Sequence, residues 1–351
     1  MANDIKTVMV TGNLGYIGCV LTPALAEQGY TVAGFDTEYF DSHCQLERFD
    51  PRLAKQIRKD MRDCQAADFE GVDAVIHLAG LSNDPLGELA PEMTHQINYL
   101  GTMRVGEMAK QAGVKRFVYA SSQSMYGISD VSREVEEDNS EKNPVTAYAK
   151  TKWQAECDLN NLAGADFMPT HFRPSTVFGA SPRLRCDIVF NNLLACAFTT
   201  GTIEIKSDGT PWRPAIHIKD VCKAFISGLV APREVLNMQA FNVGVKDGNY
   251  TVRQIAEAAQ TAVPGSALVF TGEHGPDSRT YRVCFDKILS RLGAFYTPTG
   301  DLPRGGVEMV EFFTRVGLTA ADFRSDKVIR LARLKTLVEA GKLDDNLRWK
   351  R

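Results

Sequence analysis

Three glycines spaced three residues apart follow the first apolar run of the chain, and they constrain its fold more than any other feature. The run VMVT leads directly into Gly12, Gly15 and Gly18 in the stretch VMVTGNLGYIG, residues 8–18. Between a strand and a helix, the first glycine permits a tight turn, the second lets the backbone approach a pyrophosphate, and the third lets helix and strand pack closely. The helix N-terminus then offers free N–H groups to phosphates. The stretch predicts a dinucleotide-binding turn, although glycine-rich turns also bind other phosphates.

The first half of the chain alternates between short β-branched runs and helical periodicity. The runs predict strands over Thr7–Val10, Thr31–Phe35, Ala74–Leu78 and Arg116–Ala120. The periodic segments predict helices over residues 16–28, 92–111 and 147–162. Strands that alternate with helices predict an α/β fold with a Rossmann-type, doubly wound parallel sheet. Such a sheet binds ligands at the carboxyl ends of its strands.

The alternation loosens after about residue 175, where prolines and glycines become frequent. We therefore expect residues 1–175 to form the dinucleotide-binding domain, with some later segments returning to it. Residues 176–351 are expected to form mainly a smaller, interleaved substrate-binding lobe and the C-terminal helices. In the stretch VIRLARLKTLVEA, apolar residues recur at helical spacing between basic ones, which indicates a packed helix with a charged face.

Composition excludes several classes of protein. The net charge of −3 gives no reason to expect nucleic acid as a partner, and no apolar run approaches the roughly 20 residues that span a bilayer. The eight cysteines are scattered, without a CxxC pair or a histidine at metal-ligand spacing, so we expect reduced thiols and no metal site. A strand begins almost at the N-terminus and leaves no room for a signal peptide, which makes a cytoplasmic protein the default expectation.

An acidic residue stands where a dinucleotide-binding unit places its ribose ligand. Asp36 ends the second predicted strand, eighteen residues after Gly18. A carboxylate there accepts both adenosine ribose hydroxyls and repels a 2′-phosphate, which favours NAD over NADP. Two further stretches, Asp60-Met61 after a segment expected to be helical and the small residues of HLAG, would also face the cofactor. The cofactor-binding residues predicted from these stretches are Gly12, Asn13, Gly15, Tyr16, Ile17, Gly18, Asp36, Asp60, Met61, Leu78, Ala79 and Gly80.

A tyrosine and a lysine lie one helical turn apart in the run NPVTAYAKTKWQAE. Tyr148 and Lys152 share one face of the predicted helix because residues i and i+4 do. A lysine ammonium beside a phenol favours the phenolate and lowers the tyrosine pKa from its ordinary value of about 10. Such a tyrosine can take a proton from a hydroxyl or return it. Pairs at this spacing also occur by chance on surface helices.

Hydroxyl groups follow the predicted strand Arg116–Ala120 in the stretch FVYASSQSMYG. A serine at this strand end would lie near the same face of the cofactor as the tyrosine. It could then donate a hydrogen bond to the reacting oxygen or accept one from it.

These motifs together resemble the extended short-chain dehydrogenases/reductases, in the NAD-dependent nucleotide-sugar epimerase/dehydratase family. The matches run in order over about residues 5–285. They are TGNLGYIG, HLAG, INYLGT, YAKTK, FRPSTVFG, RPAIHIKDV and YTVRQIAE. The resemblance implies Tyr148, Lys152 and Ser122 as catalytic residues, with Ser121 and Ser124 as alternatives for the hydroxyl. It also adds three residues to the cofactor site, Asn98, Tyr148 and Lys152.

The family implies a reaction in which a hydride passes from a sugar carbon to NAD while Tyr148 takes the hydroxyl proton. Return of the hydride to the other face of the sugar gives epimerisation. Two departures from the family's patterns bear on this. Dehydratases place Asp-Glu after the catalytic hydroxyl, whereas this chain has Gln123-Ser124, which disfavours dehydration. Epimerases commonly have an asparagine where this chain has Thr176, which leaves the substrate pose open.

The family's substrates are nucleotide-diphosphate sugars, and arginine suits their phosphates because it pairs with them through two hydrogen bonds. Arg213 and Arg279 match positions where the family places such arginines, although either could be an ordinary surface residue. The substrate-binding residues expected in all are Ser82, Asn83, Ser124, Thr176, Arg213 and Arg279. The resemblance also implies a homodimer formed through the helices at 92–111 and 147–162.

Three functions remain open from the sequence. The leading hypothesis is an NAD-dependent nucleotide-sugar epimerase that keeps its cofactor bound. The enzyme alternative is an NAD(P)H-dependent nucleotide-ketosugar reductase or dehydrogenase that exchanges its cofactor. The alternative from another class is a non-catalytic dinucleotide-sensing protein, which would not need the pair Tyr148 and Lys152. The nucleotide, the sugar and the reacting carbon are not specified.

Overall fold

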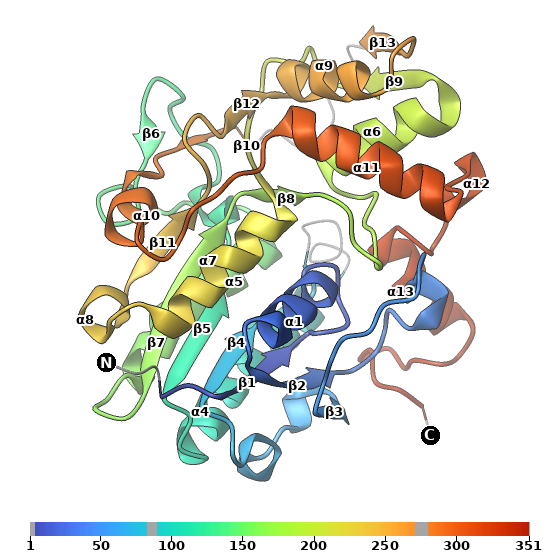
Figure 1. Ribbon diagram of the computed structural model, residues 1–351. Helices are drawn as coiled ribbons and strands as arrows, with labels where there is room; N and C mark the ends of the chain where they lie inside the picture. Colours follow the sequence, from blue (N-terminus) through green and yellow to red (C-terminus); the bar gives the residue numbers. More distant parts are fainter. Residues whose placement is uncertain (1–3, 83–89, 271–279, 351) are drawn as a thin grey trace.

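Seven parallel strands form the central sheet of the computed structural model, which describes residues 4–82, 90–270 and 280–350 (Figure 1). The strand order is β11-β7-β5-β4-β1-β2-β3. The bounds are β1 (Thr7–Thr11), β2 (Thr31–Asp36), β3 (Lys55–Arg58), β4 (Ala74–His77), β5 (Arg116–Ala120), β7 (Met168–Pro174) and β11 (Ala240–Val243). The order reverses between β1 and β4, where a doubly wound sheet opens its ligand crevice. The predicted fold class is confirmed.

Helices cover both faces of this sheet. On one face lie α1 (Gly18–Glu27) and α7 (Ile218–Val230), and on the other lie α4 (Thr102–Gln111) and α5 (Ala147–Leu159) (Figure 1). Side chains of β1 alternate between the two resulting cores, because successive residues of a strand point to opposite faces. Val8 and Val10 pack with α1 and α7, whereas Met9 packs with α4 and α5. The sheet is therefore buried on both sides.

Two local predictions differ from the structure. The segment before Asp60 was expected to be helical, but Lys55–Arg58 is the edge strand β3. Its sequence KQIR is mostly exposed and lacks an apolar run that would indicate a strand. The single helix expected over residues 92–111 is divided into α3 (Pro91–Thr94), a π-helix over His95–Gly101, and α4.

Several segments after β7 form a second layer, the smaller lobe of the molecule, at the carboxyl edge of the sheet (Figure 1). Its strands are β8 (Thr176–Phe178), β9 (Thr202–Ile205), β10 (Trp212–His217), β12 (Asn249–Thr251) and β13 (Ala267–Phe270). Its main helices are α6 (Val189–Thr200), α9 (Val252–Ala262) and α11 (Leu302–Val316). These elements share a separate apolar core that includes Phe190 and Phe313. The smaller elements are β6 (Glu134–Val135), β14 (Arg282–Val283), α8 (Arg233–Leu236), α10 (Asp286–Arg291) and α12 (Ala320–Phe323).

The last helix, α13 (Arg330–Glu339), returns to the sheet half of the molecule. Leu334 and Leu337 are buried in the same core as Phe35 and Val75, which belong to β2 and β4. The helix that the sequence predicts near the C-terminus is thus present, and its apolar side packs against the central sheet. Among the described residues, no helix combines the length and the apolar character that a membrane span requires.

A buried ion pair joins α5 to β7 behind the end of β5. Glu156 accepts three hydrogen bonds from the Arg173 guanidinium and one, of 2.6 Å, from the hydroxyl of Ser121. Both charged side chains are almost inaccessible to solvent. Burial alone would raise the pKa of Glu156, but the charge of Arg173 and these hydrogen bonds outweigh it and lower the pKa. The pair therefore stabilises the folded chain only while Glu156 is ionised.

We predict that Glu156→Gln lowers the free energy of unfolding by about 3 kcal/mol at pH 7, because it leaves a buried arginine without its counter-charge. The loss should shrink as the pH falls below about 4.5, where the carboxylate protonates in the unfolded chain. Urea unfolding between pH 3.5 and 8 measures both effects. Asp138→Asn, which removes the exposed partner of Lys287, is the control and should cost less than about 1 kcal/mol. A loss that does not change with pH would contradict this account.

Candidate active site

The turn after β1 depends on two positions that have no room for a side chain. Gly12 has φ +74°, and a Cβ atom there would lie 2.8 Å from the backbone nitrogen of Ala79. A Cβ atom on Gly18 would lie 2.5 Å from the carbonyl oxygen of Gly12. The strand ends of β1 and β4 can therefore approach closely, and Ile17, the N-cap of α1, lines the crevice between them.

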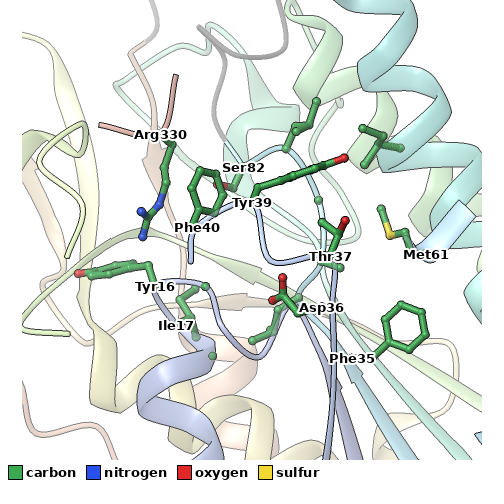
Figure 2. Close-up of a pocket in the computed structure, with 18 of the residues that line it drawn as sticks. Tyr16, Ile17, Phe35, Asp36, Thr37, Tyr39, Phe40, Met61, Ser82 and Arg330 are labelled. Carbon is green, nitrogen blue, oxygen red and sulfur yellow. The ribbon is translucent and has the colours of Figure 1, made fainter. Parts of the chain in front are cut away.

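This crevice is the pocket shown in Figure 2. Most of the predicted cofactor residues line it, namely Gly12, Gly15, Tyr16, Ile17, Gly18, Asp36, Asp60, Met61, Leu78, Ala79 and Gly80. Asn13 does not line it. Its side chain is buried behind the turn and donates to Gln56 at 2.8 Å. Asn98 is also buried, and its amide group bonds to both backbone groups of Leu81, which holds the segment after β4 in place.

Asp36 ends β2 and lines the pocket. Its carboxylate accepts the backbone N–H of Leu14 at 3.0 Å and that of Glu38 at 2.7 Å. Burial raises the pKa of this carboxyl, while the two N–H groups oppose the shift. Each oxygen accepts one backbone bond and keeps lone pairs for a ligand. The carboxylate thus suits a ribose diol, and the tight turn at Gly12 suits a pyrophosphate, so the residues present fit a dinucleotide.

Several residues of the pocket were missed by reasoning from the sequence. They are Phe35, Thr37, Tyr39, Phe40, Lys59, Leu81, Ile97, Arg185 and Arg330. Thr37 to Phe40 follow directly after β2, so their place beside Asp36 could have been expected. Arg185 and Arg330 come from distant parts of the chain, where no local motif indicates the pocket.

Ser82, expected to bind substrate, also lines this pocket. Its hydroxyl accepts a hydrogen bond of 2.8 Å from Arg185, whose guanidinium pairs with Asp187. Burial would lower the pKa of Arg185, but the charge of Asp187 outweighs it, and the nearby Tyr148 acts in the same direction. Arg185 thus lines the cofactor pocket and lies near enough to Tyr148 for the two charges to interact.

Tyr148 and Lys152 both lie on α5, as the sequence predicts. The Nζ atom of Lys152 donates to the carbonyl of Ala120 at 2.7 Å and lies 4.8 Å from the centre of the Tyr119 ring. It is also adjacent to Gly80, because a Cβ atom built there would be 3.9 Å from it. Burial lowers the pKa of Lys152 to about 7. The lysine therefore connects the end of β5 to the residues after β4 that line the pocket.

The three serines after β5 have different surroundings. Ser121 is 4% exposed and turns away to Glu156. Ser122 is only partly buried, caps the short 3₁₀ turn that follows, and lies 2.9 Å from the hydroxyl of Ser124. Ser122 and Ser124 thus form one pair of linked hydroxyls, whereas Ser121 belongs to the buried ion pair behind them.

The remaining substrate candidates lie on the second layer or outside the described residues. Thr176 begins β8, and its neighbour across the sheet is Ala215 of β10. Arg213 also lies on β10 and donates to the carbonyl of Trp212 at 2.9 Å. Asn83 and Arg279 fall outside the described residues. No group of three His, Cys, Asp or Glu side chains that could hold a metal occurs within the described ranges.

The sheet, the glycine turn and the acidic end of β2 define a Rossmann-type dinucleotide-binding protein. The sequence profile described as "NAD dependent epimerase/dehydratase family" matches residues 8–244. The UDP-glucose 4-epimerase of Mycolicibacterium smegmatis is 30% identical over 325 residues, covering 87% of this chain and 97% of the relative. That of Neisseria gonorrhoeae is 28% identical over 287 residues, covering 73% and 82%.

Solved structures agree with these relatives. The structure of MoeE5 in complex with UDP-glucuronic acid and NAD superposes with a TM-score of 0.75 at 27% identity, covering 89% of this chain and all of MoeE5. MoeE5 with UDP-glucose and NAD gives a TM-score of 0.74. This chain belongs to the NAD dependent epimerase/dehydratase family, which confirms the resemblance found in the sequence. It is an enzyme of that family, and NAD is its cofactor.

We predict that Asp36→Asn weakens NAD binding about 10-fold or more, because a charged hydrogen-bond acceptor is lost from the ribose end of the pocket. Discrimination against NADP should fall, since the repulsion of a 2′-phosphate disappears. Titration of ligand-depleted protein with each dinucleotide measures both affinities. Glu38→Gln is the matched control, because the Glu38 carboxylate pairs with Arg58. An unchanged ratio of the two affinities in Asp36→Asn would contradict the assignment.

Proposed function

We propose that this protein is an epimerase of UDP-sugars that keeps NAD bound between turnovers. The observation that carries the proposal is the placement of Lys152. Its Nζ atom lies beside Gly80 of the cofactor pocket and bonds to the last residue of β5. One turn before it on α5 is Tyr148, and two residues beyond the end of β5 is Ser122. Relatives named UDP-glucose 4-epimerase support the reaction class.

In the proposed mechanism, the chain's own groups move the proton. Tyr148 takes the proton of a sugar hydroxyl, and Ser122 holds the same oxygen by a hydrogen bond. Lys152 stabilises the phenolate of Tyr148 by its charge, and its buried position strengthens that interaction because little water screens it. When bound, NAD supplies the hydride acceptor and donor. The proton returns from Tyr148 when the sugar carbon is reduced from its other face.

The hydrogen bonds of the three serines after β5 indicate which of their hydroxyls acts on the sugar. Ser121 is committed to Glu156, so Ser122 is proposed as the catalytic hydroxyl and Ser124 as its hydrogen-bonding neighbour on the substrate side. Gln123 is buried and donates to the carbonyl of Arg173. It therefore supplies neither the acid nor the base that a dehydration would require.

For the substrate, we propose the second layer as the binding lobe. MoeE5 was solved with UDP-sugars bound, and by analogy Arg213 and Thr176 would face the diphosphate and the sugar. Ser82 would contribute from the segment after β4. The same family resemblance supports a homodimer through the helices at 92–111 and 147–162. In this division, residues 1–175 bind the cofactor together with later segments that return to the sheet, such as α7, β11 and α13, and residues 176–351 mainly bind the substrate.

We predict that Tyr148→Phe lowers kcat by about 10²- to 10⁴-fold, which is the usual contribution of a general acid–base group. The bound NAD should remain, because the substitution removes only the hydroxyl. Interconversion of UDP-glucose and UDP-galactose, followed by NMR, provides a first assay among UDP-sugars. Tyr99→Phe is the matched control. The Tyr99 hydroxyl bonds to Asp158, which lies on α5 like Tyr148. Full activity of Tyr148→Phe would exclude the proposed mechanism.

We also predict that the purified enzyme carries NAD through desalting and turns over UDP-sugar without added cofactor. An epimerase restores its cofactor in every cycle, whereas a ketosugar reductase consumes one NAD(P)H per product. The measurement is product formed per enzyme in the absence and presence of added dinucleotide. Stoichiometric consumption of NAD(P)H would favour the reductase instead.

A further inference from the structure

An arginine from the C-terminal helix lies inside the cofactor pocket. Arg330 is the first residue of α13, 2% exposed, and it lines the pocket with Tyr16, Ile17 and Phe40. Figure 2 shows its guanidinium between the rings of Tyr16 and Phe40. The family profile ends at residue 244, so α13 lies outside the part of the chain that the profile matches.

The hydrogen bonds of Arg330 leave one side of its guanidinium unused. Nη2 donates to the carbonyl of Arg183 at 2.8 Å, and the guanidinium lies 4.3 Å from the centre of the Phe40 ring. Nη1 is buried without a hydrogen-bond partner. Within the described ranges, no carboxylate lies at ion-pair distance from Arg330; the ion pairs nearby use Arg185 and Arg333. Burial lowers the pKa of Arg330 to about 10, so it remains charged at neutral pH.

The guanidinium of Arg330 lies in the same pocket as the N-terminus of α1. Tyr16, Ile17 and Gly18 line the same pocket, and Cys19 in the first turn is close enough for Arg330 to lower its thiol pKa, although burial raises that pKa overall. A helix N-terminus and a buried cation both attract negative charge. A buried charge without a partner is costly, and the anion expected at this place is a phosphate.

The segment that carries Arg330 also contacts the loops at the adenosine end of the pocket. We call residues 326–349 the C-terminal strap. Trp349 donates from its indole to the carbonyl of Thr37 at 2.7 Å, and the hydroxyl of Tyr39 donates to the carbonyl of Leu347. Arg348 pairs with Asp60 at 3.7 Å. The strap therefore fastens the loops after β2 and β3, which form the adenosine side of the crevice.

We propose that Arg330 binds the pyrophosphate of NAD, and that the C-terminal strap thereby retains the cofactor between turnovers. The diphosphate would accept a charge-assisted hydrogen bond from the guanidinium of Arg330 and further bonds from the N–H groups at the start of α1. The proposal concerns the cofactor pocket and holds for an epimerase or a reductase alike. If Arg330 proves not to bind NAD, the mechanism proposed for Tyr148 is unaffected. If Tyr148 proves not to move the proton, the binding of NAD by Arg330 is unaffected.

The test compares Arg330→Met, Arg330→Lys and, as a matched control, Lys335→Met on the exposed side of α13. For each protein we would measure the NAD dissociation rate with labelled cofactor, and the affinities of ligand-depleted protein for ADP and for adenosine. Arg330→Met should release NAD about 10- to 100-fold faster and bind ADP more weakly by a similar factor, the usual effect of a lost charged hydrogen bond. Its affinity for adenosine should change less than about twofold, since adenosine has no phosphate.

Two further results separate a phosphate contact from a structural role. Arg330→Lys should recover part of the ADP affinity, because it keeps the charge but not the fork of donors. In ligand-depleted Arg330→Met, removal of a buried charge without a counter-ion opposes the loss of the bond to the Arg183 carbonyl. Its gain in stability from NAD should be smaller than that of the wild type. Equal losses for ADP and adenosine, or unchanged ADP binding, would overturn the proposal. Lys335→Met should behave as the wild type.

Discussion

The close approach of the turn after β1 to the end of β4 is the constraint on which the site depends. The approach requires that Gly12 have no side chain, because even a Cβ atom would meet the backbone of Ala79 at 2.8 Å. The turn brings the N-terminus of α1 to the crevice, and the strand end places Gly80 beside Lys152. Because Gly12 has no side chain, the turn that suits phosphates and the helix α5, which carries the proposed catalytic pair, can both lie beside the end of β4.

A second constraint separates the serines after β5. The buried pair of Glu156 and Arg173 engages Ser121, whereas the hydroxyls of Ser122 and Ser124 bond to each other. Neither residue of the ion pair lines the crevice. The ion pair holds Ser121, the residue before the proposed catalytic hydroxyl, in one position, which a purely apolar contact would specify less strictly.

Much of the fold and part of the site could be predicted because the relevant signals are local. The spacing of Gly12, Gly15 and Gly18, the position of Asp36 and the turn between Tyr148 and Lys152 each depend on a few neighbouring residues. The sheet followed from alternating runs, whereas the exposed strand β3 lacks an apolar run and was missed. Asn13 was assigned to the pocket from its place in the motif, yet its side chain pairs with Gln56 behind the turn.

The remaining part of the site depends on tertiary contacts. Arg185 and Arg330 reach the pocket from segments that fold back over it, and no periodicity or spacing in the sequence indicates that path. An arginine taken by itself is just as typical of a solvent-exposed helix or loop as of a buried pocket. The C-terminal helix was correctly expected to be packed, but its partner, the core that contains Phe35 and Val75, could be identified only in three dimensions.

The contact between Trp349 and Thr37 spans 312 positions of the chain. At ordinary translation rates, about 15 to 60 s separate the synthesis of these two residues. During that interval the sheet half can already be assembled, while the rim of its crevice at Tyr39 and Phe40 lacks its cover. The nascent chain thus exposes aromatic surface at the place where the finished protein encloses a nucleotide, and a chaperone or early cofactor binding would protect it there.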